Sequence, residues 1–258
     1  MPGFFSDSVL VFSGLDPCGG AGLSADIEAI NQFGISPLPI ASALTSQNTS
    51  EVTAVQAVDC TLIESQFNDL VKDIDFRVAK IGLLASAAQI STITHCFLGK
   101  PELRIVLDPI VCSSSRKQLL DDETLAAMKS KLIPMTEIIT PNRSELALLA
   151  PGLDETEAVK ELDCPWVLVT GTDGSEKEIE HRLYRGGDLH DCFVYIKLPG
   201  EYHGSGCTLA SSISALLALG VDMDIACKRA LDYCYQTLLS AKKLGKMQYH
   251  PNRTKPTT

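Results

Sequence analysis

The sequence predicts a three-layer α/β/α fold, in which helices cover both faces of a mostly parallel sheet with antiparallel edge strands. Three observations lead to this prediction. Short β-branched, apolar runs alternate along the chain with longer segments of helical spacing. Four glycines lie between residues 14 and 22, directly after the first predicted strand. Gly186-Gly187 separates two late strand-like segments, which is typical of a hairpin.

The predicted strands are apolar runs that end at turn residues. Residues 8–13 (SVLVFS) are followed by the glycine-rich segment, and residues 166–170 (WVLVT) end at Gly171. Residues 104–107 (RIVL) end at Asp108-Pro109, because proline cannot donate a hydrogen bond to a ladder. The full set of predicted strands is 8–13, 38–44, 79–83, 104–107, 137–140, 166–170, 178–184 and 192–198.

The predicted helices carry apolar residues three or four positions apart, as in residues 22–33. The full set of predicted helices is 22–33, 62–74, 87–97, 121–132, 142–149, 208–219 and 223–244. No linker rich in proline, serine or glycine divides the chain, so residues 1–258 are expected to form one domain. The polar tail from 248 to 258 carries two prolines and is expected to be peripheral.

Composition excludes several classes of protein. The 258 residues are 45% hydrophobic and 21% charged, which is ordinary for a globular protein. The net charge is −10 and no run of lysine and arginine stands out, so no nucleic-acid or membrane partner is expected. No apolar stretch approaches the roughly 18 residues that a membrane helix needs. The first residues lack the pattern of a secretion signal, so we expect a cytoplasmic protein.

The nine cysteines do not form a metal-binding pattern. No two of them are three positions apart, so the paired spacing of a structural zinc site is missing. Most of these thiols are expected to be small, buried apolar side chains. Cys207 has a different context, described below.

The glycine-rich segment after the first strand has the composition of a ligand-binding turn. Glycines let backbone N–H groups approach a ligand closely, and the following helix begins with a positive dipole end. The segment 20–25 (GAGLSA) fits a dinucleotide fingerprint only weakly, because no acidic residue follows the second strand. The alternative is a tight strand-to-helix turn without a ligand, but the flanking carboxylates Asp16 and Asp26 favour a ligand site.

A second glycine-rich turn precedes the helix predicted at 208–219. Gly204 and Gly206 flank Ser205 and free the backbone, so successive N–H groups can form an anion-binding nest. Cys207 is then expected in the first helical turn, where the dipole and the exposed N–H groups stabilise a thiolate. The alternative role for Cys207 is a buried residue that caps a core helix.

Polar residues at other strand ends suggest a metal. Asp108 follows a strand, and Asn142 and Glu145 begin a helix at a spacing that equally fits a capping box. The helix termini contribute roughly half a charge each, which cannot neutralise a triphosphate. A Mg²⁺ ion held by Asp108 and Glu145 would provide the missing positive charge. Together these features predict phosphoryl transfer.

Six motifs then resemble those of a known family, in the same order along the chain. They are SGLDPCGGAGLSAD at 13–26, ALTSQN at 43–48, KIGLL at 80–84, VLDP at 106–109, TPNRSE at 140–145 and HGSGCTL at 203–209. They resemble the hydroxymethylpyrimidine/phosphomethylpyrimidine kinases of thiamine biosynthesis, which have a ribokinase-like fold. The resemblance spans about residues 8 to 245.

The resemblance implies an ATP- and Mg²⁺-dependent kinase that acts twice. It would phosphorylate 4-amino-5-hydroxymethyl-2-methylpyrimidine and then convert the monophosphate to the diphosphate. It also implies a homodimer. Cys207 would act as the base, with the N–H groups of Gly204, Ser205 and Gly206 beside it. The pyrimidine would lie against Gly14, Asp26, Gln47, Leu83 and Ile110. The ATP phosphates would contact Asn142, Thr170, Gly171 and Thr208.

The chain departs from the family pattern at a few positions. Thr170 stands where many relatives have lysine, and Leu83 replaces a usual methionine. The loop after Cys112 lacks the usual motif, although Arg116 or Lys117 could contact phosphate. The alternatives are a pyridoxal or pyridoxine kinase of the same fold and a non-catalytic pyrimidine-binding protein. An NAD-dependent oxidoreductase is the weakest alternative, because it rests on the glycines alone.

Overall fold

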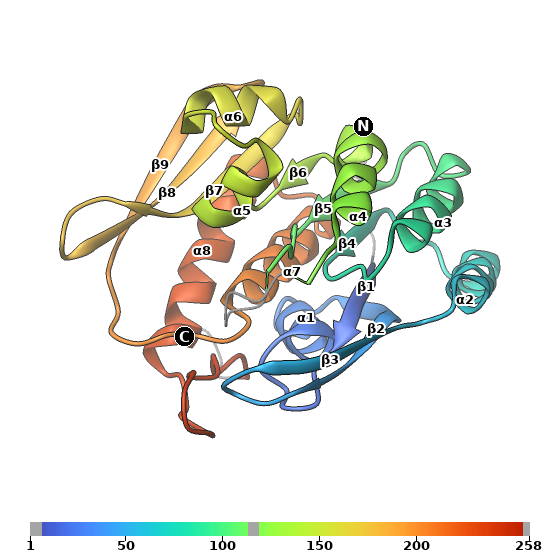
Figure 1. Ribbon diagram of the computed structural model, residues 1–258, viewed down its shortest axis with the longest axis horizontal. Helices are drawn as coiled ribbons and strands as arrows, with labels where there is room; N and C mark the ends of the chain where they lie inside the picture. Colours follow the sequence, from blue (N-terminus) through green and yellow to red (C-terminus); the bar gives the residue numbers. More distant parts are fainter. Residues whose placement is uncertain (1–6, 113–118, 255–258) are drawn as a thin grey trace.

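The computed structural model describes residues 7–112 and 119–254 and contains a nine-stranded sheet covered by helices on both faces (Figure 1). The strand order is β3-β2-β1-β4-β5-β6-β7-β8-β9. Neighbouring strands from β2 through β1 to β7 are parallel, whereas β3, β8 and β9 pair antiparallel. The predicted fold class, a mostly parallel sheet with antiparallel edge strands, is therefore confirmed.

The elements follow the predicted order closely. The strands are β1 (Ser8–Leu15), β2 (Ser36–Gln47), β3 (Val52–Ala57), β4 (Val78–Ile81), β5 (Arg104–Leu107), β6 (Ile138–Ile139), β7 (Trp166–Asp173), β8 (Glu178–Arg185) and β9 (Asp188–Ile196). The helices are α1 (Gly22–Asn31), α2 (Cys60–Asp73), α3 (Ala87–Leu98), α4 (Asp122–Ala127), α5 (Arg143–Leu149), α6 (Glu155–Glu161), α7 (Ser205–Ala218) and α8 (Met223–Leu239). After α4 the chain continues as a π-helical turn and a 3₁₀ turn up to Met135.

The side chains of β1 show why helices cover both faces of the sheet. Val9 and Val11 pack in one core with α1, α7 and α8, whereas Leu10 and Phe12 pack in a second core with α2 and α3. Because successive side chains of a strand point to opposite faces, a strand that is apolar throughout must be covered on both. The order of the strands reverses beside β1, since β2 lies on one side of it and β4 on the other. Ligands of such sheets bind at this kind of switch point.

Two elements were not predicted. The strand β3 has the sequence VTAVQA, and each of its residues is half-buried or exposed, so it lacks the strong apolar run of a central strand. The helix α6 buries only Ala158 and Val159 and is defined mainly by its capping box, in which Asp154 and Glu157 bond each other's backbone. Both elements lie where burial contributes little to the sequence pattern.

The prediction of a peripheral tail is wrong for residues 248–253. The last helix ends at Leu239, five residues earlier than predicted, and the chain then turns back toward the amino-terminal loops (Figure 1). The Gln248 N–H donates to the Thr49 carbonyl, and Tyr249 forms a backbone bridge with Tyr202. Arg253 is only 1% exposed. The tail is therefore held by backbone pairing and by one buried arginine.

None of the helices in the described chain is long and apolar enough to cross a membrane.

A buried glutamine connects α3 to two neighbouring segments. Gln89 is fully buried, and its side-chain oxygen accepts from the Ala85 N–H at 2.9 Å. Its amide nitrogen donates to the carbonyls of Ser42 and Val58 at 2.7 and 2.8 Å. One amide thus bonds three backbone groups, one within β2 and one just before each of α2 and α3.

Gln89→Leu is expected to lower the free energy of unfolding by about 2–4 kcal/mol, because it removes the side-chain partner of the Ala85 N–H and of the Val58 carbonyl and one of the two donors to the Ser42 carbonyl. Urea denaturation would measure this change. Ser91→Ala, two residues later on the same helix, is the control, and its effect should stay below about 1 kcal/mol. Equal effects of the two substitutions would contradict the role given to Gln89.

Candidate active site

A cavity of about 930 Å³ lies at the carboxyl ends of the parallel strands. Its wall is formed by the loops after β1, β4, β5, β6 and β7 and by the start of α7. Thirteen of the fifteen predicted site residues line this cavity: Gly14, Gln47, Leu83, Asp108, Ile110, Asn142, Glu145, Thr170, Gly171, Gly204, Ser205, Gly206 and Cys207. The structure therefore brings together residues that are far apart in the sequence.

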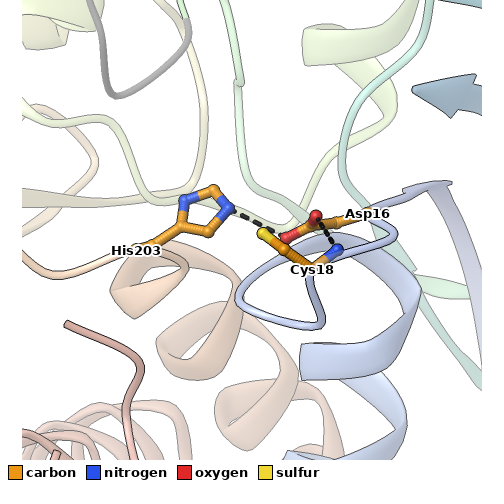
Figure 2. A group of neighbouring side chains, drawn as sticks. All are labelled: Asp16, Cys18 and His203. Atoms are coloured by element: carbon orange, nitrogen blue, oxygen red, sulfur yellow. Dashed lines mark hydrogen bonds and ion pairs between the residues drawn. The ribbon is translucent and has the colours of Figure 1, made fainter. Parts of the chain in front are cut away.

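The carboxylate of Asp16 organises the first glycine-rich turn. One oxygen accepts the N–H of Cys18 at 2.9 Å, and the other accepts those of Gly20 and Ala21 at 3.0 and 2.8 Å. His203 Nε2 lies 2.8 Å from the same second oxygen, so the carboxylate also links the two glycine-rich turns (Figure 2). Burial alone would raise the pKa of Asp16, but these hydrogen bonds hold it well below its usual range.

Asp16, Cys18 and His203 lie close enough together to share a metal ion. Their contacts favour a hydrogen-bonded turn instead. The Asp16 oxygens already accept four hydrogen bonds. Burial and the neighbouring Asp16 raise the pKa of the Cys18 thiol to about 11, so this thiol stays protonated at neutral pH.

The two glycine-rich turns are in direct contact, and two glycines make this possible. Gly204 has a φ of +81°, and a Cβ there would lie 2.0 Å from the Gly20 carbonyl oxygen. A Cβ on Gly20 would lie 2.2 Å from the His203 ring. Both distances are far below van der Waals contact, so a side chain at either position would push the turns apart.

The second turn ends in the first residues of α7. Gly204 is the N-cap, and Ser205, Gly206 and Cys207 form the first turn of the helix. The first four N–H groups of an α-helix have no acceptor within the helix. All four of these residues line the cavity, so an anion there can meet both the N–H groups and the positive end of the helix dipole.

Cys207 faces the cavity but is a protonated thiol in this environment. The residue is 4% exposed, and burial, together with Asp108 and Asp26, raises its pKa. Lys80 and the Gly22 N–H oppose this effect without reversing it. The expectation that the helix terminus stabilises a thiolate is therefore wrong for this state of the protein. Burial of the sulfur, and after it the charges of Asp108 and Asp26, disfavours the thiolate.

Lys80 is a central residue of the site to which no role was predicted. It is fully buried, and its ammonium lies 2.9 Å from Asp26 and 3.9 Å from Asp108. Burial alone would lower its pKa, but these carboxylates raise it, so Lys80 stays charged. A Cβ at Gly82 would lie 2.6 Å from the ammonium, so this glycine makes room for it. The sequence signal for this buried ion pair was a lysine within the otherwise apolar run of β4.

Two of the predicted site residues, Asp26 and Thr208, do not line the cavity. Asp26 is fully buried and does not line the cavity, because its carboxylate binds Lys80 and accepts from Ser211 at 2.7 Å. Thr208 is also fully buried, and its hydroxyl donates to the Gly204 carbonyl at 2.8 Å. Arg116 and Lys117, the predicted phosphate contacts of the loop after Cys112, lie outside the described residues.

Asp108 and Glu145 both line the cavity and interact electrostatically. Burial raises the pKa of Asp108, while Lys80 and the Cys207 thiol oppose this effect. Oδ2 of Asp108 is buried and has no hydrogen-bond partner among the described residues. Burial and the charge of Asp108 raise the pKa of Glu145 to about 8. A cation between the two carboxylates would relieve this repulsion.

Glu145 also forms the predicted capping box of α5. Its carboxylate accepts the N–H of Asn142 at 2.9 Å, and the Asn142 side chain accepts the N–H of Glu145 at 3.0 Å. The capping box is therefore confirmed. A capping role does not exclude a metal role, because both residues line the cavity.

Comparison with known proteins identifies the family. A sequence model described as phosphomethylpyrimidine kinase matches residues 16–252. The chain belongs to the phosphomethylpyrimidine kinase family. This kinase is accordingly a phosphotransferase, and its role in thiamine biosynthesis agrees with the names of its relatives.

One relative is the hydroxymethylpyrimidine/phosphomethylpyrimidine kinase of Rhizobium meliloti, which is 30% identical over 252 residues and 91% of each chain. Among solved structures, the phosphomethylpyrimidine kinase of Clostridium difficile is 28% identical, with a TM-score of 0.75 over 90% of this kinase and 99% of that chain. Bacillus subtilis pyridoxal kinase, solved as an ADP complex, shares the fold at 23% identity. Its TM-score is 0.86 over 96% of this kinase and 98% of that chain. The ribokinase-like fold implied by the resemblance is thereby confirmed.

The raised pKa of Glu145 predicts how the stability of the metal-free kinase depends on pH. The folded state binds this proton more tightly than the unfolded state, so the free energy of unfolding should fall as pH rises from about 5 to about 8. Glu145→Gln removes the titrating group, and the variant should lose less stability over that range, by up to about 1 kcal/mol per pH unit.

Urea denaturation in EDTA at several pH values would measure this difference. Glu157→Gln is the matched control, because Glu157 has the same capping position at the exposed start of α6. An unchanged pH dependence in Glu145→Gln would contradict the electrostatics described for the site.

Proposed function

We propose that this kinase transfers the γ-phosphoryl group of ATP to 4-amino-5-hydroxymethyl-2-methylpyrimidine and then phosphorylates the monophosphate to the diphosphate. The observation that carries the proposal is the position of Cys207. Its thiol lies in the first turn of α7, beside cavity-facing N–H groups and next to Asp108. Nucleophile activation and anion stabilisation can therefore occur at one point of the cavity. The name of the Rhizobium meliloti relative supports the choice of substrate.

The end of the cavity at the switch point beside β1 offers a place for the pyrimidine. Gly14, Leu83 and Ile110 provide small and apolar surface there, and Gln47 is half-buried at the end of β2. The side-chain amide of Gln47 both donates and accepts, as the edge of an aminopyrimidine requires. In this proposal Asp26 acts indirectly, by fixing Lys80 under the site.

The phosphates of ATP would lie between the start of α7 and the loops after β6 and β7. The N–H groups of Gly204 to Cys207 would bind the transferring phosphoryl group, whose charge grows on its outer oxygens. Asn142, Thr170 and Gly171 would contact the remaining phosphates from the opposite wall. Beyond them the cavity reaches Tyr195 and Tyr235, which provide an aromatic surface for the nucleoside base.

In the transfer step, the hydroxymethyl oxygen forms a bond to the γ-phosphorus while the bond from that phosphorus to the bridging oxygen breaks. ADP leaves with that electron pair, and the Cys207 sulfur takes the hydroxyl proton. Cys207 must be a thiolate at that moment, so its thiol must first release its own proton to solvent. Lys80 and the Gly22 N–H favour the thiolate, whereas burial and Asp108 oppose it. A thiolate held in this way is a strong base, because the pKa of its thiol is raised.

Asp108 and Glu145 would hold Mg²⁺. The donor set fits this ion, because both groups are carboxylates on the cavity wall and Asp108 Oδ2 has no hydrogen-bond partner among the described residues. When bound, the ion would neutralise charge on the β- and γ-phosphates. The carboxylates would then be ionised, which reverses the pKa increase of Glu145.

Several expectations stay predictions. They are a homodimer, a cytoplasmic location and the absence of nucleic-acid and membrane partners. A pyridoxal kinase stays the alternative within the same fold, since Bacillus subtilis pyridoxal kinase has this architecture. A non-catalytic pyrimidine-binding protein is disfavoured by the joint presence of Cys207, Asp108 and Glu145 in one cavity.

A coupled ATP assay would test the substrate directly. We expect turnover of the hydroxymethylpyrimidine and of its monophosphate in the presence of Mg²⁺, and loss of turnover in EDTA. A much higher kcat/KM for pyridoxal would support the alternative activity. No turnover of ATP with any of these substrates would leave a binding protein as the correct description.

Cys207→Ala is expected to lower kcat by about 10²-fold or more, because the variant lacks the proposed base. Steady-state kinetics with the pyrimidine would measure the effect. Cys227→Ala is the control, since Cys227 is a buried thiol of α8 that does not line the cavity, and it should change stability only. A kcat near the wild-type value in Cys207→Ala would remove the base assignment while leaving the kinase activity in place.

A further inference from the structure

The tail residue Arg253 contacts both glycine-rich turns from inside the protein, on the side away from the cavity. Its Nε donates to the Thr208 hydroxyl at 2.7 Å, and its Nη2 donates to the carbonyls of Gly20 and, at 3.4 Å, Gly204. Its Nη1 lies 3.3 Å from the Glu28 carboxylate. The Arg253 side chain is 1% exposed and the Glu28 side chain is 43% exposed. The buried guanidinium is therefore paired with a carboxylate at the protein surface.

The position of the Gly204 carbonyl fixes the direction of an N–H group in the cavity. In a trans peptide the C=O of one residue and the N–H of the next point in opposite directions. The Gly204 carbonyl accepts from the Thr208 N–H, the Thr208 hydroxyl and Arg253, all inside the protein. The N–H of Ser205 is therefore turned the other way, out of the start of α7 and toward the cavity.

The same argument applies to the first turn. Arg253 holds the Gly20 carbonyl, so the N–H of Ala21 points away from it and donates to Asp16 at 2.8 Å. Asp16 in turn binds His203, the residue before Gly204. The guanidinium and the Asp16 carboxylate thus hold the two turns together from opposite sides.

The guanidinium also carries charge. A hydrogen bond from a cation to a carbonyl polarises the peptide and strengthens the donor at its other end. Arg253 does not line the cavity, so it can act on a bound phosphoryl group only through the Gly204–Ser205 peptide and the field at the start of α7.

We propose that Arg253 is a positioning residue for phosphoryl transfer. Through its hydrogen bond to the Gly204 carbonyl, it orients and polarises the N–H groups at the start of α7. This inference rests on the proposed function. It makes the tail after Leu239 part of the active site, although no residue after Gln248 lines the cavity in the described chain.

Arg253→Met, assayed with the pyrimidine, ATP and Mg²⁺, tests the proposal. The variant keeps the apolar stem and removes both charge and donors. We expect kcat to fall by about 10²-fold, since small misplacement of transition-state donors has effects of this size. The KM for the pyrimidine and its Kd from calorimetry should change less than about threefold, because Arg253 makes no hydrogen bond to any residue proposed to hold the pyrimidine.

Arg253→Lys keeps the charge but cannot span the four acceptors of the guanidinium, so kcat should fall about tenfold. Tyr233→Phe is the matched control. The Tyr233 hydroxyl donates to the Arg253 carbonyl at 2.8 Å, so this variant loosens the same tail and leaves the guanidinium intact. Its melting temperature should fall while kcat stays near the wild-type value.

Three outcomes would overturn the proposal. The first is a wild-type kcat in folded Arg253→Met. The second is a parallel loss of kcat, pyrimidine affinity and melting temperature in all three variants, which would assign Arg253 to stability alone. The third is a failure of both Arg253 variants to fold. An inactive wild-type chain would instead contradict the proposed function, so the two failures can be distinguished.

Discussion

The contact between the two glycine-rich turns is the constraint on which the site depends. Gly20 and Gly204 approach so closely that no side chain fits at either position. This contact places the first turn of α7 at the switch point beside β1, where the cavity opens. Asp16 holds the contact on one side by binding three backbone N–H groups and His203. The fold thus creates an anion site from backbone groups, and the side chains around it serve to hold those groups in place.

The site also depends on a balance of buried charges. The chain carries a net charge of −10, yet its cavity is suited to a polyanion. The fully buried Lys80 balances the charges of Asp26 and Asp108. The carboxylates of Asp108 and Glu145, which line the cavity, leave a place for a cation. Removing one member of such a cluster leaves an uncompensated charge in a medium of low dielectric constant. The local balance of charges therefore matters more to this chemistry than the overall field.

Much of the fold could be predicted because its central strands, such as β1 and β5, are mainly apolar and are followed directly by Asp-Pro. The edge strand β3 and the exposed helix α6 could not, because they bury too little to produce a pattern. The cavity residues came from strand ends and glycine-rich turns, whose position follows from the topology alone. Asp26, Lys80 and Arg253 show the limit of this reasoning. Whether a charged side chain faces a ligand or a buried partner depends on packing between elements that are distant in the sequence, such as Arg253 against Gly20.

The central claim is that the N–H groups of residues 204–207 bind the transferring phosphoryl group beside the Cys207 sulfur. The most direct measurement is a crystal structure of the kinase with ADP, aluminium fluoride, Mg²⁺ and the hydroxymethylpyrimidine. The account predicts the fluoride group within hydrogen-bond distance of these N–H groups, with the pyrimidine hydroxyl between it and the Cys207 sulfur. A fluoride group bound elsewhere in the cavity, or a hydroxyl that points away from Cys207, would contradict it.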